Sequence, residues 1–308
     1  MWFWLSLIAL LCWSGSDLFS KIGCRDARDK YSHLKMVMAV GVVMGLHAAY
    51  EVFVGGTVIN LDILLTYLPV SLLYILSMAM GYVGLRYIEL SISSPICNSS
   101  GALVAVLAIL FDGIAGYSPL ALFAVALVCV GAVGLGVVEV REDDELRIER
   151  QKASNYKYTK SFMALAMPAA YCVLDAAGTF ADSRVLEIIS RTVEDYEASA
   201  NVAYELTFLL AGILSFVYVV LIKQDRLVPK MEAPKYVGAV CETAGQFAYI
   251  YAIADTEHLA MSAPIIASYC AASVLWSRIF LKEKLSWKHY AMIALIVAGI
   301  AIMGVFDL

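Results

Sequence analysis

The chain has 308 residues, of which 61% are hydrophobic and 16% charged, and its mean hydropathy is +0.77. Soluble domains of this size carry about a quarter charged residues, so this apolar excess requires a bilayer as solvent. The net charge is −5 and no basic tract of the nucleic-acid-binding kind occurs, so we expect no nucleic-acid partner. The composition therefore predicts an integral membrane protein.

The seven cysteines form no CxxC pair and show no metal-ligand spacing. Six of them lie in or at the ends of apolar segments, where a free cysteine behaves as a small hydrophobic residue. The chain also lacks a nucleotide-binding loop, a nucleophile elbow and an HExxH motif. We therefore predict that the protein is not an enzyme, holds no metal or cofactor, and does not pump by hydrolysing a nucleotide.

Ten segments are long and apolar enough, or nearly so, to cross a hydrocarbon core of about 30 Å, which takes roughly 20 residues. Most connections are short, and the longest polar stretches are 141–160 and 182–200. The pattern predicts an all-α integral membrane protein with ten transmembrane helices. The predicted spans are 2–20, 33–54, 65–87, 95–111, 118–138, 161–181, 201–222, 234–254, 261–281 and 287–306.

Three stretches of the first half recur in the second half in the same order. Because each half has five spans, the second copy enters the membrane from the opposite side, which gives the inverted repeat found in many secondary transporters. We predict a first repeat at 1–140, a charged linker at 141–160 and a second repeat at 161–308. The matched stretches are Trp13 to Asp17 with Tyr171 to Asp175, Tyr82 and Pro95 with Tyr251 and Pro264, and Gly131 and Gly136 with Gly299 and Gly304.

Lysine and arginine are concentrated in the connections that follow the first, third, fifth, seventh and ninth predicted spans. The opposite connections hold only Arg184 and Arg191, among several acids. By the positive-inside rule, both termini are expected outside the cytoplasm, and the linker at 141–160 inside it.

The second half resembles the EamA repeat of the drug/metabolite transporter superfamily. The resemblance lies in the small-residue helix Ala260 to Ser268 with its proline, the turn Phe280 to Ser286 and the Gly-containing stretch Ala294 to Ile300. Ser91 to Pro95 and the Trp-Ser-Gly-Ser beginning at Trp13 extend it more weakly to the first half. The resemblance implies a ten-helix transporter with a central cavity near the start of the fourth and ninth helices. It leaves the substrate open, since relatives carry amino acids, aromatic compounds, quaternary amines, nucleotides and sugar phosphates, and it favours cytoplasmic termini, against the charge count.

Two acids lie deeper in the predicted spans than any others. Glu242 is followed at i+4 and i+7 by Gln246 and Tyr249, so all three share one helix face. Asp175 has Tyr171 at i−4, and Gly178 and Asp182 follow at i+3 and i+7. Ionisable groups at this depth usually face a cavity or a partner. The two carboxyls could balance a cationic substrate with help from aromatic rings, carry protons, or make only interhelical hydrogen bonds.

Five further residues complete the candidate site. Asp17 is the repeat partner of Asp175, although an ion pair with Lys21 one turn later also explains it. Trp13 and Tyr82 are repeat-paired aromatic residues. Asn98 and Ser268 are placed near the cavity by the resemblance as hydrogen-bond donors, and helix packing is the alternative.

Other polar residues of the spans have simpler explanations. His47 is either a proton relay or a buried histidine with a satisfied hydrogen bond. Glu51, Glu89, Glu205 and Asp255 lie near predicted helix ends, where we expect interfacial water to solvate them.

The sequence thus predicts a secondary active transporter of a small metabolite that works by alternating access in a bacterial cell membrane. A cationic or zwitterionic amine is favoured, because the two deep acids face no equally deep lysine or arginine. The alternatives are a proton-coupled exporter of neutral or amphipathic compounds, or a non-transporting component such as a flippase subunit or an assembly partner. The expected partners are the solute, protons as a coupling ion and membrane lipid, and the oligomeric state stays open, a homodimer included.

Overall fold

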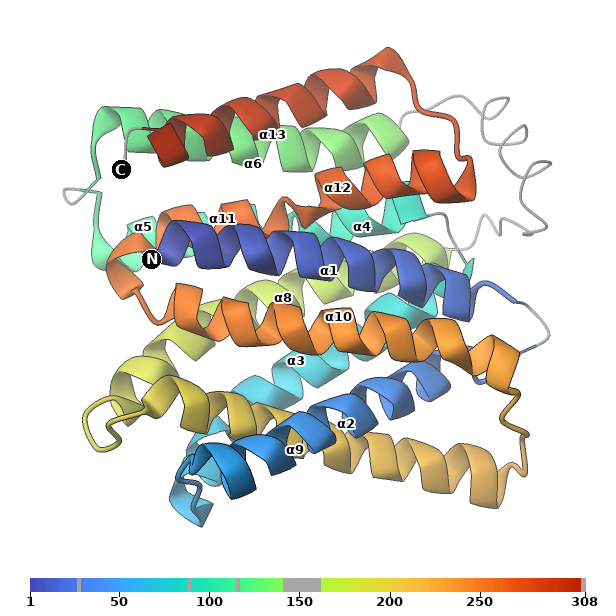
Figure 1. Ribbon diagram of the computed structural model, residues 1–308. Helices are drawn as coiled ribbons and strands as arrows, with labels where there is room; N and C mark the ends of the chain where they lie inside the picture. The colour runs from blue at the N-terminus through green and yellow to red at the C-terminus, as the bar shows by residue number, and fades with distance from the viewer. Residues whose placement is uncertain (27–28, 88–89, 115–116, 141–161, 306–308) are drawn as a thin grey trace.

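The computed structural model describes residues 1–26, 29–87, 90–114, 117–140 and 162–305. Within these ranges the chain is helical and contains no strand, and ten helical rods form one bundle (Figure 1). The predicted linker at 141–160 lies outside the described residues. The first five rods are α1 (Trp2–Cys24), α2 (Ser32–Tyr50) continued by η1 (Glu51–Gly55), α3 (Leu61–Tyr87), α4 (Leu90–Asn98) with α5 (Ser100–Asp112), and α6 (Pro119–Val140).

The second half of the chain repeats this order of rods. The ninth rod, like the fourth, is broken near its middle. The second five rods are α8 (Phe162–Ile189), α9 (Tyr196–Phe216) with η2 (Val217–Ile222), α10 (Pro229–Ile253), the rod of η3 (Thr256–His258), α11 (Leu259–Ala267), α12 (Tyr269–Trp276) and η4 (Ser277–Leu281), and finally α13 (Trp287–Val305).

Eight of the rods in the described part of the chain are long and apolar enough to cross a membrane. The two that fall short are α8 and α10. They carry the acids Asp175, Asp182 and Glu242, which lower the hydropathy of these helices. Both lie inside the bundle against other helices, α8 on α3 and α10 on α1, so protein rather than lipid surrounds much of their polar surface (Figure 1).

The fourth and ninth rods break at matching positions. Ser99 separates α4 from α5 and Ser268 separates α11 from α12, and each serine lies four residues after a proline, Pro95 or Pro264. Proline has no N–H to donate and its ring crowds the preceding turn, which favours a break. The two broken rods pack on each other, α5 on α11 and α4 on α12, near the middle of the bundle.

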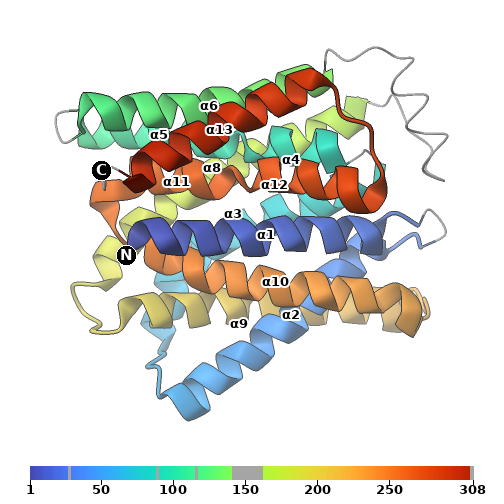
Figure 2. The ribbon, with the colours of Figure 1, turned by 45° about the horizontal axis from the view of Figure 1, so that its top comes forward.

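The remaining helices pair around this centre. α2 packs on α9 at one side of the bundle, and α6 packs on α13 at the other (Figure 2). Both pairs cross closely at glycines: a Cβ at Gly41 would lie 2.8 Å from the carbonyl oxygen of Phe208 and 2.9 Å from the Cα of Gly212. Close backbone approach at small residues is how membrane helices gain packing contacts where lipid offers no hydrophobic drive.

The bundle has two distinct ends. Met1 and the end of α13 lie at one end of the bundle. The connections 223–228 and 282–286 and residues 25–26 and 29–31, which hold many of the basic residues, lie at the other (Figure 1). We call the latter the basic end. There the buried ammonium of Lys235 lies 3.2 Å from Asp29 and 3.0 Å from Glu232, and Lys35 lies 3.0 Å from Asp29. These ion pairs hold the connection between α1 and α2 against the start of α10.

Several predicted helix ends are wrong, and the sixth span matters most. The prediction ended this span at residue 181, whereas α8 continues to Ile189. The seventh helix begins at Tyr196 rather than at 201, so the predicted polar stretch 182–200 shrinks to a short turn. The prediction ended the span just before Asp182, but Asp182 remains helical, and tyrosine hydroxyls of α3 hydrogen-bond to its carboxyl group.

The crossing of α2 and α9 yields a prediction for stability. Gly41→Leu should lower the thermal stability of the detergent-purified protein by the equivalent of about 1–3 kcal/mol, because the side chain overlaps the backbone of α9. Val42→Leu is the matched control, since Val42 is exposed on the outer side of α2. Equal melting temperatures for the two variants would show that this crossing is not tight.

Candidate functional site

A cavity lies at the centre of the bundle, between the broken rods and the helices α1, α3, α8 and α10. Three carboxyl groups line it, those of Asp17, Asp175 and Glu242, and no lysine, arginine or histidine occurs among the lining residues that the structure describes. Most of the rest of the wall is aromatic or carries small hydroxyl groups. The aromatic side chains are Trp13, Tyr74, Tyr82, Tyr171, Tyr204, Tyr249 and Tyr269.

Asp17 is held by serines of two other rods. Its Oδ2 accepts hydrogen bonds from Ser94 Oγ on α4 at 2.5 Å and from Ser273 Oγ on α12 at 2.8 Å. The ammonium group of Lys21, considered above as its ion-pair partner, donates to the carbonyl oxygen of Leu85 at 2.8 Å. The structure therefore gives Asp17 a place in the cavity wall and two neutral donors.

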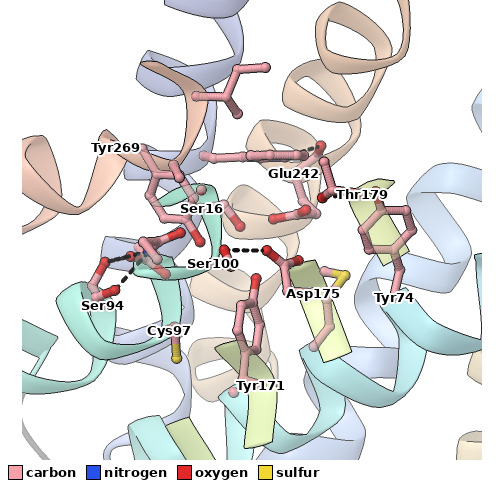
Figure 3. Close-up of a pocket in the computed structure, with 18 of the residues that line it drawn as sticks. Ser16, Tyr74, Ser94, Cys97, Ser100, Tyr171, Asp175, Thr179, Glu242 and Tyr269 are labelled. Atoms are coloured by element: carbon pink, nitrogen blue, oxygen red, sulfur yellow. Dashed lines mark hydrogen bonds between the residues drawn. The ribbon is translucent and has the colours of Figure 1, made fainter. Parts of the chain in front are cut away.

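Asp175 is held in a similar way from the opposite side. Its Oδ2 accepts from Ser100 Oγ, at the start of α5, at 2.7 Å (Figure 3). The ring of Tyr171, one turn earlier on α8, stands beneath this carboxyl group (Figure 3). Asp17 and Asp175 thus each accept from a serine of a broken rod that belongs to the other half of the chain.

Glu242 reaches the same space from α10, and Figure 3 shows its carboxyl group on the side of the cavity near Ser16. The indole of Trp13 donates to the backbone carbonyl of Glu242 at 3.3 Å. That indole packs on Gly245, where a Cβ would collide with it. Its ring lies 5.0 Å from the ring of Tyr249, which places an aromatic surface beside the carboxyls.

Two polar atoms of the cavity wall have no hydrogen-bond partner among the described protein atoms. They are Nε2 of Gln246 and the hydroxyl group of Tyr82, and both side chains are more than nine-tenths buried. An unsatisfied buried polar group costs about 1–3 kcal/mol. A molecule in the cavity that hydrogen-bonds to these atoms would remove that cost.

The structure brings nine of the ten candidate residues into the wall of this cavity. They are Trp13, Asp17, Tyr82, Asn98, Tyr171, Asp175, Glu242, Gln246 and Tyr249. The tenth, Ser268, is buried at the break between α11 and α12 and donates to the carbonyl oxygen of Ile265, while its neighbours Ala267 and Tyr269 line the cavity. Asn98 donates to the carbonyl oxygen of Ser94 at 2.8 Å, so one of its amide hydrogens stays within its own helix.

Residues that the sequence analysis did not single out complete the wall. Ser94, Ser100 and Ser273 hold the aspartates, and Thr179 and Tyr74 line the cavity beside Asp175. Serine and threonine are common in membrane helices for packing reasons alone, so their types gave no signal. Thr179 does lie at i+4 from Asp175, on the stripe that continues to Asp182.

Glu205 was expected in interfacial water, and this expectation is wrong. Its side chain is fully buried between α9 and α2, where its Oε1 lies 2.9 Å from Nδ1 of His47. Asn201 donates to the same oxygen at 3.1 Å. Neither His47 nor Glu205 lines the cavity, so the structure provides a local partner for each.

Comparison with solved structures supports the helical fold. No curated protein matches the sequence. Twenty-seven chains of solved structure match the fold. One of them, a crystal structure of a protein, is 15% identical and superposes with a TM-score of 0.61, covering 98% of this chain and 96% of that chain. At this identity the likeness shows the fold alone.

The eight apolar rods make the chain a multi-pass membrane protein. Residues 188–305 match the model of the EamA-like transporter family, which confirms the resemblance found in the sequence. This match covers less than half of the chain, and it indicates a membrane transporter of the drug/metabolite transporter type.

The charge of the cavity yields a prediction that needs no substrate. The test uses a variant that keeps only Cys97, a cysteine that lines the cavity. Each reaction rate is divided by the rate of the same reagent with a free thiol. After this division, 2-aminoethyl methanethiosulfonate should react at least tenfold faster than the 2-sulfonatoethyl reagent. Three carboxyls without a base attract the cationic reagent. A variant that keeps only Cys129, which lies outside the cavity on α6, should show no such preference. A ratio at Cys97 equal to that of the free thiol would contradict a negative cavity.

Proposed function

We propose that the protein is a secondary active transporter that carries a small amine-containing cation or zwitterion through the central cavity by alternating access, in a bacterial cell membrane. The observation that carries the proposal is a buried cavity with three carboxyl groups and no basic residue in its described wall. The EamA-like family supports a transport function. The solute class rests on the chemistry of the wall.

Electrostatics favours a cationic solute. Ionised carboxyls in a low-dielectric site are costly unless a counter-charge or proton accompanies them, and three in one cavity also repel one another. An ammonium group placed among Asp17, Asp175 and Glu242 would reduce both costs. The faces of Trp13 and Tyr249 offer cation–π contacts of about 0.5–2 kcal/mol.

The unpartnered polar atoms add specificity to this proposal. The hydroxyl of Tyr82 and the amide of Gln246 lie in the same wall as the acids and have no protein partner. An amine solute with a second polar group, such as a hydroxyl or a carboxylate, would hydrogen-bond to them. This is why a zwitterion stays within the proposed class.

Alternating access requires two halves that can exchange roles, and the reciprocal packing of α6 and α13 supports such an inverted repeat. A Cβ at Gly131 would meet the carbonyl oxygen of Met292 and the side chain of Ile296. A Cβ at Gly299 would meet the carbonyl oxygen of Ala124 and the side chain of Val128. Gly131 therefore corresponds to Gly299. The residues that they meet also correspond, Met292 to Ala124 and Ile296 to Val128. The two members of each of these pairs are 168 residues apart in the sequence, as expected if a two-fold axis passes between the two helices.

The same exchange of partners occurs at α2 and α9. A Cβ at Gly41 would meet the carbonyl oxygen of Phe208, and a Cβ at Gly212 would meet that of Val37. Gly41 and Gly212 are 171 residues apart in the sequence, and so are Val37 and Phe208. Around the cavity, Trp13 of α1 packs on Gly245 of α10, and Tyr171 of α8 packs on Gly81 of α3. Trp13 and Tyr171 are partners in the predicted repeat. An inverted repeat of five and five helices accounts for all of these pairs.

The proposal predicts which variants lose the solute. Tyramine, choline and tyrosine should raise the melting temperature of the detergent-purified protein, because a ligand at 100 times its dissociation constant adds about 2.7 kcal/mol, and benzyl alcohol and benzoate should not. Glu242→Gln and Asp175→Asn should remove the response to the amines and abolish saturable counterflow in liposomes, with little change in the melting temperature of the ligand-free protein.

Glu187→Gln is the matched control, because Glu187 lies exposed on α8 and pairs with Arg191 outside the cavity. Full counterflow in Glu242→Gln or Asp175→Asn would remove that residue from the site. Stabilisation by benzyl alcohol alone would favour export of neutral compounds, with the acids serving protons. No saturable flux of any compound in the panel would favour a non-transporting membrane component.

A further inference from the structure

A fourth buried carboxyl group, that of Asp182, lies next to the cavity but does not line it. It is on α8, two turns from Asp175 toward the end of the bundle that holds the termini, and its exposed fraction is 0%. Its Oδ1 accepts from the hydroxyl of Tyr67 at 2.7 Å and its Oδ2 from that of Tyr74 at 3.4 Å. In the described part of the chain Asp182 forms no ion pair.

The groups that face Asp182 are acids or neutral hydroxyls. Tyr67 and Tyr74 come from α3, Tyr204 from α9 and Tyr249 from α10. On α8 itself, the carboxyl group of Asp175 lies two turns away on the same face, and Glu187, five residues from Asp182, is exposed and pairs with Arg191. The remaining titratable groups of neighbouring helices are engaged elsewhere: Cys97 of α4 lies on the side of Asp175, and Asp112 of α5 pairs with Arg184 at 2.6 Å.

A carboxylate in these surroundings lacks a counter-charge. Hydrogen bonds from two hydroxyls offset only part of the cost of burying its charge, so binding a proton is the remaining way to neutralise it. A proton-bound Asp182 also donates a hydrogen bond, which an ionised Asp182 does not.

Three hydroxyls connect Asp182 to the cavity. Tyr74, Tyr249 and Thr179 line the cavity and hydrogen-bond to one another, with Tyr74 and Tyr249 each donating to Thr179 at 3.1 and 3.2 Å. Each hydroxyl has one proton, so Tyr74 donates to only one of Asp182, Thr179 and Tyr249 at a time. When Asp182 is ionised, its carboxylate accepts the hydrogen bond from the hydroxyl of Tyr74. When Asp182 is protonated, the hydroxyl of Tyr74 donates to Thr179 or Tyr249 instead. The protonation of Asp182 therefore changes the hydrogen bonds that the cavity wall presents.

We propose that Asp182 binds the proton that this transporter exchanges for its amine solute. The inference rests on the transport function proposed above. Asp175, Thr179 and Asp182 share one face of α8, and two turns separate the carboxyls by about 10 Å. At that distance a cation beside Asp175 and a proton on Asp182 neutralise the same buried region, and each weakens binding of the other on the order of tenfold. This mutual weakening of binding is what couples exchange.

The proton step is a simple acid–base equilibrium. The carboxylate of Asp182 takes a proton from water when the site faces one side of the membrane and returns it to water when it faces the other. The O–H bond that forms on one side breaks on the other, and no electrons are transferred. One proton leaves the binding region for each amine cation that enters it.

The test uses the full-length protein in liposomes with [³H]choline as the probe, a quaternary ammonium ion that cannot cross the bilayer by losing a proton. For one proton per cation, the steady-state accumulation ratio of the wild type should change about tenfold for each unit of pH gradient. Asp182→Asn should lose this response and accumulate no choline, yet retain choline counterflow at equal pH, because counterflow needs binding and reorientation but no proton. Asp182→Glu should restore part of the response. Asp112→Asn, which removes a carboxyl at the same end of the bundle outside the cavity, should respond like the wild type.

Each other outcome contradicts the proposal. A tenfold response retained in Asp182→Asn overturns it, as does loss of counterflow in a well-folded Asp182→Asn, which would make Asp182 a binding or structural group. Counterflow in the wild type without any response to the pH gradient overturns the coupling and leaves the transport function intact. Absence of choline counterflow in the wild type overturns the proposed function and the coupling together.

A second variant keeps the test decisive if Asp182→Asn fails to fold, as judged by gel filtration. Tyr67→Phe keeps the ring and removes the shortest hydrogen bond to Asp182. It should reduce the response to a pH gradient at least threefold while counterflow persists. An unchanged response in Tyr67→Phe would then overturn the proposal.

Discussion

The structure depends on the burial of carboxyl groups that hydroxyls, rather than cations, hold in place. Asp17 accepts from serines on α4 and α12, Asp175 from a serine on α5, and Asp182 from tyrosines on α3. In a low-dielectric interior these hydrogen bonds stabilise the fold, because a buried carboxyl group without a partner costs several kcal/mol. Each acid therefore fixes the position of helices from both halves of the chain, and the broken rods are held where they face the cavity.

The acids at the basic end form ion pairs with lysines. Asp29 and Glu232 contact the ammonium groups of Lys35 and Lys235, so their charge is balanced within the protein. The central acids have no such partner in the described residues, and their negative charge stays available to a solute or a proton. The contrast separates the part of the molecule that holds the helix ends together from the part that can bind.

Helix packing differs between the outside and the centre of the bundle. The glycine crossings of α2 with α9 and of α6 with α13 are tight and reciprocal, and they lie on either side of the cavity. Breaks at Ser99 and Ser268 leave the two central rods in short pieces. The structure thus combines tight outer pairs, each of which joins the two halves of the chain, with two interrupted rods at the centre.

The sequence by itself determined the helical membrane class, the ten helical rods, the family of the second half and the depth of Glu242 and Asp175, because a bilayer imposes length and hydropathy that are read residue by residue. It placed Asp182 in a connection and Glu205 in interfacial water, because hydropathy takes no account of a hydrogen-bond partner on another helix. It also placed Ser268 in the cavity wall, whereas the neighbouring residues Ala267 and Tyr269 line the cavity and Ser268 does not. Each step of one residue along a helix turns the side chain by about 100°, so a prediction that is wrong by one residue points to another side of the helix. Which serines and tyrosines meet which acids was decided only by the tertiary structure, because those contacts join residues as far apart as Asp17 and Ser273 through helix crossings that no local pattern specifies.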